Sequence, residues 1–251
     1  VHFTISPEHL AAACAKVEEV CRRMEREYGV KFDISFSIQK PSTDTVAAAM
    51  DGSPYREDGS LFFRPGGHGA LIENLNDLDA DFVFLKNIDN VVPDSRRGDT
   101  VAYKKVLGGV LAAVKQQIDR YCSVLGNGTP SPAELAEMLA FARETLCITH
   151  DGMETADADA TAGYLRRKFN RPVRVCGMVV NEGEPGGGPF LARNPDGTVS
   201  PQILESSQID MTDSRSAEIA RQATHFNPVD LVCAIRDFHG VKFNLPDYVD
   251  P

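Results

Sequence analysis

RPGGHGALIENLNDLDADFVFLKNIDN, residues 64–90, contains a turn, a helix and a strand in direct succession. Three glycines and a proline surround His68, and the apolar residues after it recur at helical spacing. A strand follows at 81–86 and ends on Asn87-Ile88-Asp89-Asn90. A turn without side chains that opens a helix exposes backbone N–H groups, which suit an anion or the polar edge of a base. Open α/β sheets bind ligands beyond the carboxyl ends of their strands, so this stretch predicts an α/β fold with a ligand site.

The same segments also have structural interpretations. Pro65–Gly69 could be a tight turn, and Asn87–Asn90 could be an Asx-rich turn that ends a strand; the residues alone leave both alternatives open. A second glycine-rich loop, Gly186–Gly188, favours a hairpin connection. Glu205 could be a solvated strand residue, and Lys40, in a Ser/Thr-rich loop after a strand, could be a solvated lysine.

The N-terminal third alternates between strand and helix patterns. A strand is predicted at 1–5, and Ser6-Pro7-Glu8 is a typical helix start. The helix that follows should end at Gly29. Another strand is predicted at 31–37, and the turn residues of 50–59 predict a surface excursion.

Helical patterns dominate the middle of the chain, and strand patterns return after it. Helices are predicted at 106–125, 131–147 and 155–169. They carry no evident chemistry, so we interpret them as packing elements or an inserted helical subdomain. Strands are predicted at 172–181, 200–209 and 230–238. This order predicts the α/β class, with a mixed twisted sheet flanked by helices.

Composition narrows the range of partners. The 251 residues can bury a sizeable core, as one large or two small domains. The formal net charge of −10 argues against nucleic-acid and membrane partners, because both require a basic face. No apolar stretch is long enough for a bilayer and the N-terminus has no signal pattern, which predicts a cytoplasmic protein.

Cysteine spacing and the chain ends give two further expectations. The six cysteines are scattered without a CxxC pair, which favours reduced, packed thiols over disulfides or zinc. The chain opens on a strand-like Val1 and stops without a closing element at Pro251. We therefore expect an excised part of a longer protein.

The motifs and their order resemble the UDP-sugar pyrophosphorylases, nucleotidyltransferases of the GT-A-like α/β fold. That family carries a Phe-x-Gln strand end, a Pro-Gly-His-Gly loop, an Asn-x-Asp-Asn strand end, a Glu-x-x-Gln segment and a Phe-Asn strand start. The corresponding segments, the first two with one extra residue each, are Phe36-Ser37-Ile38-Gln39, Pro65-Gly66-Gly67-His68-Gly69, Asn87-Ile88-Asp89-Asn90, Glu205-Ser206-Ser207-Gln208 and Phe226-Asn227.

A closer similarity is to a bacterial family described as domain of unknown function 4301. The stretches that carry it are FRPGGHGALIENLNDLDAD, KNIDNVVPD, RVCGMVVNEGEPGGGPF, ESSQID and THFNPVDLVC. That family implies no activity of its own, so the functional prediction depends on the resemblance to the pyrophosphorylases.

The pyrophosphorylase resemblance implies a nucleotide site and a magnesium site. The residues that would line the nucleobase pocket are Gly66, Gly67, His68 and Gly69. Asn87 and Asn90 would shape the nucleotide site or contact the ribose. Asp89 would hold Mg²⁺ at the triphosphate.

It also implies a sugar site and catalytic cations. Glu205 would accept hydrogen bonds from sugar hydroxyls, with Asn227 and Gly187 beside it. Arg236, nine residues after Asn227, corresponds to a phosphate-contacting lysine of the family. Lys40 is the second predicted catalytic cation. Nucleotidyl transfer is an in-line attack on the α-phosphorus, which requires positioning and charge neutralisation and no covalent nucleophile.

The implied organisation is a nucleotide-binding part at 1–98, a helical segment or insertion at 99–170 and a sugar-binding, β-rich part at 171–251. The family's glycine-rich triphosphate loop with its trailing Arg and Lys has no counterpart here, so the N-terminal strand and glycine loop of the core are missing. Either the loop lies upstream or catalysis has been lost.

The predicted function is therefore a nucleotidyltransferase-like domain that forms or binds a nucleoside-diphosphate sugar, with a nucleotide and a sugar phosphate as partners. We expect the fragment alone to be inactive. The alternatives are a non-catalytic nucleotide-sugar-binding module and a protein whose glycine loops are purely structural.

Overall fold

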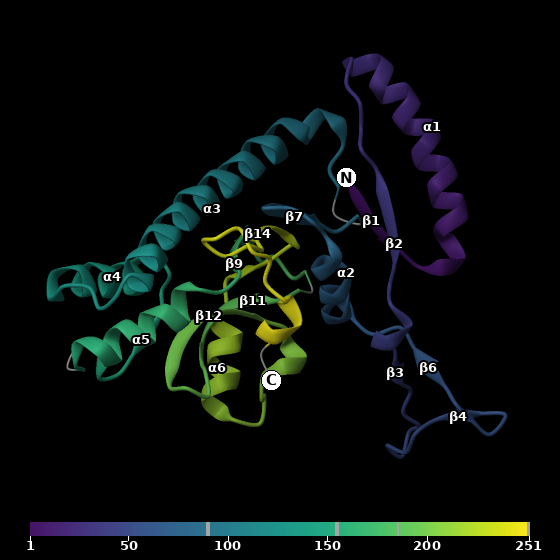
Figure 1. The fold of residues 1–251 in the computed structure, drawn as a ribbon. Helices are drawn as coiled ribbons and strands as arrows, with labels where there is room; N and C mark the ends of the chain where they lie inside the picture. The colour runs from purple at the N-terminus through teal and green to yellow at the C-terminus, as the bar shows by residue number, and fades with distance from the viewer. Residues whose placement is uncertain (89–90, 154–155, 185, 250–251) are drawn as a thin grey trace. The chain divides into compact units, whose positions relative to one another are not determined.

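The computed structural model describes residues 1–88, 91–153, 156–184 and 186–249 (Figure 1). The chain divides into two compact units, which we describe separately. Unit 1 comprises Val1–Asp79 and Asn244–Pro251, and unit 2 comprises Ala80–Phe243. The mixed α/β class is confirmed. The single mixed sheet is wrong, because the described strands form several small sheets and only β1 and β2 pair in parallel.

Unit 1 is built on a β-α-β crossover. Its helices and strands are β1 His2–Ile5, α1 Leu10–Tyr28, β2 Ser35–Ile38, β3 Thr45–Val46, β4 Arg56–Glu57, β5 Ser60–Leu61, β6 Phe63–Arg64 and α2 Ile72–Asp77. The rings of Phe3 and Phe36 stack at 5.7 Å on one face of the β1–β2 pair. As predicted, α1 ends at Gly29, whose φ of 65° suits a residue without a Cβ.

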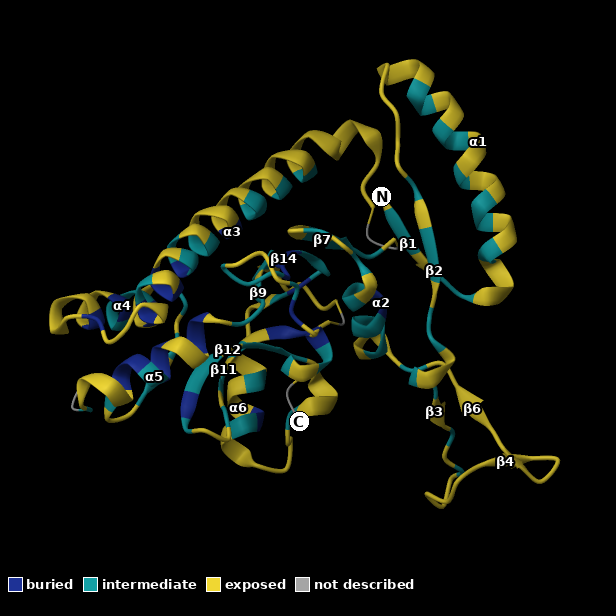
Figure 2. Cartoon of the chain, in the orientation of Figure 1, coloured by how far each residue is buried: buried dark blue, intermediate teal, exposed yellow. Residues whose placement is uncertain are grey.

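The predicted excursion after β2 is confirmed. Strand β3 pairs with β6, and β4 pairs with β5. All of these strand residues are exposed, as Figure 2 shows. Asn74 of α2 is buried and donates from Nδ2 to the carbonyl of Ile38 at 2.8 Å. Asn76 accepts from the backbone N–H of Leu245 at 2.8 Å, so the C-terminal segment returns to unit 1.

Unit 2 contains a three-stranded antiparallel sheet with β14 in the centre, between β7 and β9. Its helices and strands are β7 Phe82–Lys86, α3 Arg97–Gly126, α4 Pro132–Glu144, β8 Thr149–His150, α5 Ala158–Phe169, β9 Val173–Cys176, β10 Val179–Val180, β11 Gly188–Arg193, β12 Thr198–Leu204, α6 Ser214–Gln222, β13 His225–Phe226 and β14 Asp230–Ala234. Leu111 of α3 packs on Val232 and Ala234 of β14.

The main core of unit 2 lies among α3, α4 and α5, the helices predicted to serve in packing. The rings of Tyr121 and Phe169 stack at 5.6 Å, and Phe141 contacts both edge-on. Helix α4 follows Ser131, where a helix is predicted to begin, and Ser131 and Glu134 cap it by accepting from each other's backbone N–H groups. In the described ranges, no helix is long and apolar enough to cross a membrane.

The predicted strands of the C-terminal third are too long. The strand predicted at 172–181 divides into β9 and β10 around Gly177, and β10 pairs instead with β13. The strand predicted at 200–209 ends at Leu204, because Ser206–Gln208 forms a 3₁₀ helix. The strand predicted at 230–238 ends at Ala234, before a turn closed by Gly240 with a φ of 79°.

Candidate functional site

One end of the β7–β14–β9 sheet, which we call the rim, lies close to most of the described polar residues of unit 2 that were predicted to bind a ligand. Asp230, which begins β14, is paired in register with Lys86, which ends β7. Leu231 is paired with Cys176, the last residue of β9. The carboxyl ends of β7 and β9 therefore meet the amino end of β14, and Asn87 follows directly after Lys86.

Gly187, Glu205 and Asn227 come together beside this rim. The backbone N–H of Asn227 donates to the carbonyl of Gly187 at 2.9 Å. A Cβ at Gly187 would lie 2.5 Å from Cγ2 of Ile203 and 3.2 Å from Oε1 of Glu205. Only glycine fits this position, and the predicted proximity of the glycine run to Glu205 is confirmed.

Asn227 connects this group to the sheet. Its side chain is buried, with 6% exposed, and Nδ2 donates to the carbonyl of Gly177 at 2.7 Å. The N–H of Gly177 in turn donates to the carbonyl of Asp230 at 2.8 Å. A continuous series of hydrogen bonds therefore links Gly187 to the start of β14.

The backbone between Asn227 and Asp230 is strained. Val229 has a φ of 55°, a left-handed conformation that is a clear outlier for a β-branched residue. Its N–H donates to Oδ1 of Asn227 at 3.0 Å, which helps to hold it there. Such strain is typical of functional sites, where surrounding contacts maintain an unfavourable conformation.

Two lysines share the carboxylate of Asp230. Lys86 Nζ lies 3.1 Å from Oδ2, and Lys104 Nζ, from α3, lies 2.6 Å from Oδ1. The three side chains are only 26%, 28% and 19% exposed, in the order Lys86, Lys104, Asp230. We call these three residues the lysine–aspartate cluster.

Glu205 also has a local structural role. Its carboxylate accepts from the backbone N–H of Gln208, and its own N–H donates to Oε1 of Gln208 at 2.9 Å. The Glu-x-x-Gln motif is thus a reciprocal cap on the short 3₁₀ helix. Glu205 is nevertheless exposed, so its carboxylate remains accessible to a ligand.

The predicted nucleobase loop belongs to unit 1. The carbonyl of Gly66 accepts from Nε2 of Gln39 at 3.0 Å, and a Cβ at Gly66 would lie 2.6 Å from the carbonyl oxygen of Thr43. Gly67 and Gly69 face open space, and His68 is exposed at the start of a 3₁₀ helix. Gln39 therefore positions the loop and leaves its tip accessible.

The two predicted catalytic cations belong to different units. Arg236 lies beyond the opposite end of β14, about 20 Å from Asp230 at the usual rise per strand residue. There its guanidinium contacts the carboxylate of Asp81 at 3.2 Å and the carbonyl of Gly240 at 2.7 Å. Lys40 is in unit 1, paired with Asp77 at 2.8 Å. Arg236 therefore lies away from the end of β14 that is near Asn227, and the catalytic roles of Arg236 and Lys40 stay predictions.

The predicted magnesium ligand, Asp89, and its neighbour Asn90 lie outside the described residues. Within the ranges that are described, no group of three or more His, Cys, Asp or Glu side chains could hold a metal ion. Asp230, the carboxylate on the rim, already contacts two ammonium groups, which would repel a divalent cation. The Mg²⁺ site predicted at Asp89 therefore stays a prediction.

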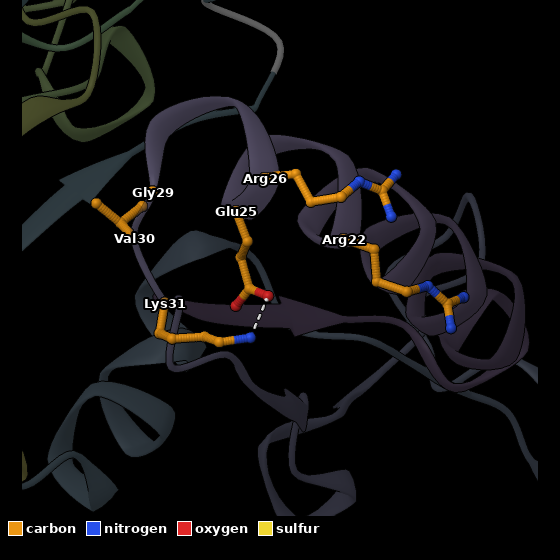
Figure 3. Close-up of a pocket in the computed structure, with 6 residues that line it drawn as sticks. All are labelled: Arg22, Glu25, Arg26, Gly29, Val30 and Lys31. Carbon is orange, nitrogen blue, oxygen red and sulfur yellow. Dashed lines mark hydrogen bonds and ion pairs between the residues drawn. The ribbon is translucent and has the colours of Figure 1, made fainter.

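A pocket of about 390 Å³ in unit 1 is lined by none of the predicted residues (Figure 3). It lies at the C-terminal end of α1 and is lined by Arg22, Glu25, Arg26, Gly29, Val30 and Lys31. The N–H of Phe32 and the Lys31 ammonium lower the pKa of Glu25 by donating to its carboxylate. These contacts fix the turn after α1, and we assign the pocket no ligand.

The sequence prediction missed the lysine–aspartate cluster. Lys104 precedes Leu107 and Leu111 at helical spacing, on the stripe of α3 that packs toward the sheet. A charged residue on a buried stripe requires a counter-ion, and this was the available signal. The identity of its partner, Asp230, depends on strand pairing, which the sequence pattern does not give.

Comparison with known protein families shows to which family the chain belongs. The family model described as "Domain of unknown function (DUF4301)" matches residues 1–251. The chain belongs to this family. No curated protein and no solved structure significantly matches the DUF4301 chain. The predicted similarity to this family is therefore confirmed, whereas the more distant resemblance to UDP-sugar pyrophosphorylases stays a prediction.

Proposed function

We propose that this DUF4301 domain binds a nucleoside-diphosphate sugar and belongs to the nucleotidyltransferase-like proteins of the GT-A-like class. One observation carries the proposal. Gly187, Glu205 and Asn227, the three residues predicted for a sugar site, come from separate segments and lie together in unit 2.

The proposed sugar site combines an accessible acceptor with a rigid support. The exposed carboxylate of Glu205 would accept hydrogen bonds from sugar hydroxyls. Gly187 lets that carboxylate and the backbone approach closely, and the buried side chain of Asn227 fixes both to the end of the sheet. A fixed acceptor orients a ligand at a smaller entropic cost than a mobile one.

For unit 1, taken by itself, we propose that the loop Gly66–Gly69 contacts the nucleobase. At its accessible tip, Gly67 and Gly69 face open space and offer backbone N–H groups beside the exposed His68. In the reaction of this class, a phosphate oxygen of a sugar 1-phosphate attacks the α-phosphorus of a nucleoside triphosphate, and pyrophosphate leaves.

The test is a thermal-shift screen of the protein with nucleoside triphosphates, nucleoside-diphosphate sugars and sugar 1-phosphates. We expect a nucleoside-diphosphate sugar to raise the melting temperature of the wild type. Glu205→Gln should weaken this effect, because the amide keeps the acceptor for the 3₁₀ cap and loses the charge. Glu184→Gln, which makes the same change on an exposed loop residue, is the matched control.

Pyrophosphate release from a nucleoside triphosphate and a sugar 1-phosphate is measured in parallel. Binding with release supports a transferase, and binding without release supports the non-catalytic binding module. A screen in which no nucleotide or nucleotide-sugar stabilises the wild type would overturn the proposal.

A further inference from the structure

The lysine–aspartate cluster carries an excess of positive charge that is largely removed from water. Lys86 and Lys104 contribute two ammonium groups and Asp230 one carboxylate, so the three together have a net charge of +1. About three-quarters of each lysine side chain is covered. An uncompensated, partly desolvated charge is unfavourable until a counter-ion occupies the site.

The ammonium groups also have hydrogen-bonding capacity to spare. Each has three N–H donors, and Asp230 accepts one from each. Over the described parts of the chain, Asp230 is the one carboxylate paired with either lysine. The N–H groups that Asp230 does not use come from two lysines on different elements, and they could bind a ligand that has several acceptor oxygens.

We propose that Lys86 and Lys104, held in place by Asp230, form the phosphate-binding subsite of this domain. The inference rests on the proposed function for the identity of the rest of the ligand. The group bound is a phosphate or diphosphate, either attached to a sugar or released as pyrophosphate.

The position of the cluster favours this assignment. Hydrogen bonds from Asp230 through Gly177 and Asn227 lead to Gly187, beside Glu205. A phosphate at the lysines and a sugar at Glu205 would therefore be held by one continuous, hydrogen-bonded support. The paired ammonium groups exclude a divalent cation from the same point, so the site selects an anion.

Asp230 is a positioning residue in this proposal. It brings two mutually repulsive ammonium groups to one place, and it competes with the ligand for their donors. Replacing it with asparagine removes the competing charge while keeping an acceptor oxygen. A purely structural ion-pair network would respond differently, because its loss would lower stability without changing anion affinity.

The experiment measures the affinity of the full chain for inorganic pyrophosphate and for glucose 1-phosphate, by titration calorimetry at low ionic strength. The variants are Lys86→Met, Lys104→Met and Asp230→Asn. Lys105→Met is the matched control, since Lys105 is the exposed neighbour of Lys104 on α3. Circular dichroism establishes that each variant is folded.

We expect each of the two lysine variants to weaken pyrophosphate binding about tenfold, the usual effect of losing one charge-assisted contact. Lys105→Met should bind like the wild type, and Asp230→Asn should bind more tightly. Stronger binding of glucose 1-phosphate than of pyrophosphate would assign the site to the sugar phosphate, and the reverse order to the leaving group.

Unchanged affinity in both lysine variants would overturn the proposal. If the lysine variants do not fold, Asp230→Asn decides, because tighter binding supports the subsite and unchanged binding overturns it. Lysine-dependent pyrophosphate binding without any nucleotide-sugar binding would sink the proposed function alone. If the lysine variants bind the nucleotide-sugar as tightly as the wild type does, the phosphate subsite alone is wrong. If the wild type binds neither ligand, both proposals are wrong.

Discussion

Lys104 and Asp230, 126 residues apart in the sequence, meet at 2.6 Å. The pair joins the first half of α3 to the beginning of β14, at the point where Lys86 ends β7. Because two of the three charges come from paired strands and the third from a helix packed on the sheet, folding of unit 2 assembles the cluster. The packing of Leu111 on Val232 holds α3 against the sheet, and it therefore also brings Lys104 close to Asp230.

Glycine should be required at position 187 for stability. Gly187→Ala would place a Cβ 2.5 Å from Ile203 and should cost about 1–3 kcal/mol of unfolding free energy, as overpacking does. Gly67→Ala is the control, because its Cβ would meet open space and its φ of −66° suits alanine. Urea unfolding of both variants is the measurement, and equal stabilities would contradict the packing at Gly187.

The Gly67→Ala variant also separates structure from binding in the loop. Its stability should stay within about 0.5 kcal/mol of the wild type. If the loop contacts a nucleobase, nucleotide affinity should nevertheless fall, because a methyl group obstructs the exposed backbone. Calorimetric titration with the nucleoside-diphosphate sugar measures this. Wild-type affinity in Gly67→Ala would remove Gly67 from the proposed nucleotide contact.

The cysteines should differ sharply in reactivity, with all six as free thiols. Burial raises the pKa of Cys122 to about 11, and burial with the neighbouring Cys176 raises the pKa of Cys233 to about 12. At pH 8 both should therefore stay protonated and resist iodoacetamide, whereas the exposed Cys147 should react. Mass spectrometry of tryptic peptides gives the order of modification.

The denatured protein provides the control for that experiment. Without reductant, denaturant should expose all six thiols to the reagent, as the sequence spacing predicts. A deficit in the denatured sample would reveal a disulfide. Rapid modification of Cys233 in the native sample would contradict its burial at the centre of the sheet.

Local signals predicted the ends of several elements. Gly29 ends α1 and Ser131 begins α4 through contacts with their immediate neighbours, so the sequence carries the whole cause. The ends of the strands were harder to predict. An apolar run shows that a segment can form a strand, but pairing decides where the strand ends, and β10 turns away to pair with β13.

The candidate site shows the same division. Gly187 and Glu205 are close together, as we expected, although the resemblance that prompted the expectation stays a prediction. Arg236 fits the spacing of that resemblance and yet lies beyond the opposite end of β14, because strand β14, Asp230–Ala234, runs between Asn227 and Arg236 and separates them. The role of Lys104 was not predicted, because helix periodicity shows which face of a helix is buried but not which residue of another element contacts it.

The side chain of Asn227 should contribute substantially to the stability of unit 2. Asn227→Asp keeps the acceptor for the N–H of Val229 but replaces the donor to Gly177 with a charged oxygen that faces a carbonyl. We expect a loss of about 1–3 kcal/mol, the cost of an unsatisfied buried polar contact. Asn194→Asp changes a partly buried asparagine that donates to the hydroxyls of Thr198 and Ser200. It should cost less, because the hydroxyl of Ser200 can reorient and donate to the new carboxylate.

Acid should weaken unit 2 through Asp196. The buried ammonium of Lys168, only 7% exposed, donates to its carboxylate at 2.5 Å, and with the hydroxyl of Thr198 it holds the pKa of Asp196 well below its usual range. A carboxyl group whose pKa is lower in the folded state stabilises the protein above its unfolded pKa. That contribution disappears as the pH falls toward the folded value.

The variant Asp196→Asn isolates this effect. At pH 7 it should lose about 1–2 kcal/mol, less than a fully buried pair, because Asp196 is 52% exposed and solvent screens the interaction. The difference from the wild type should stay constant down to about pH 4, the unfolded pKa of aspartate, and shrink below it. Asp151→Asn, on a 96% exposed side chain, should change stability by less than about 0.5 kcal/mol at either pH. Urea unfolding at pH 7, 5 and 3 tests this, and a difference between wild type and Asp196→Asn that does not narrow at pH 3 would show that Lys168 does not depend on the charge of Asp196.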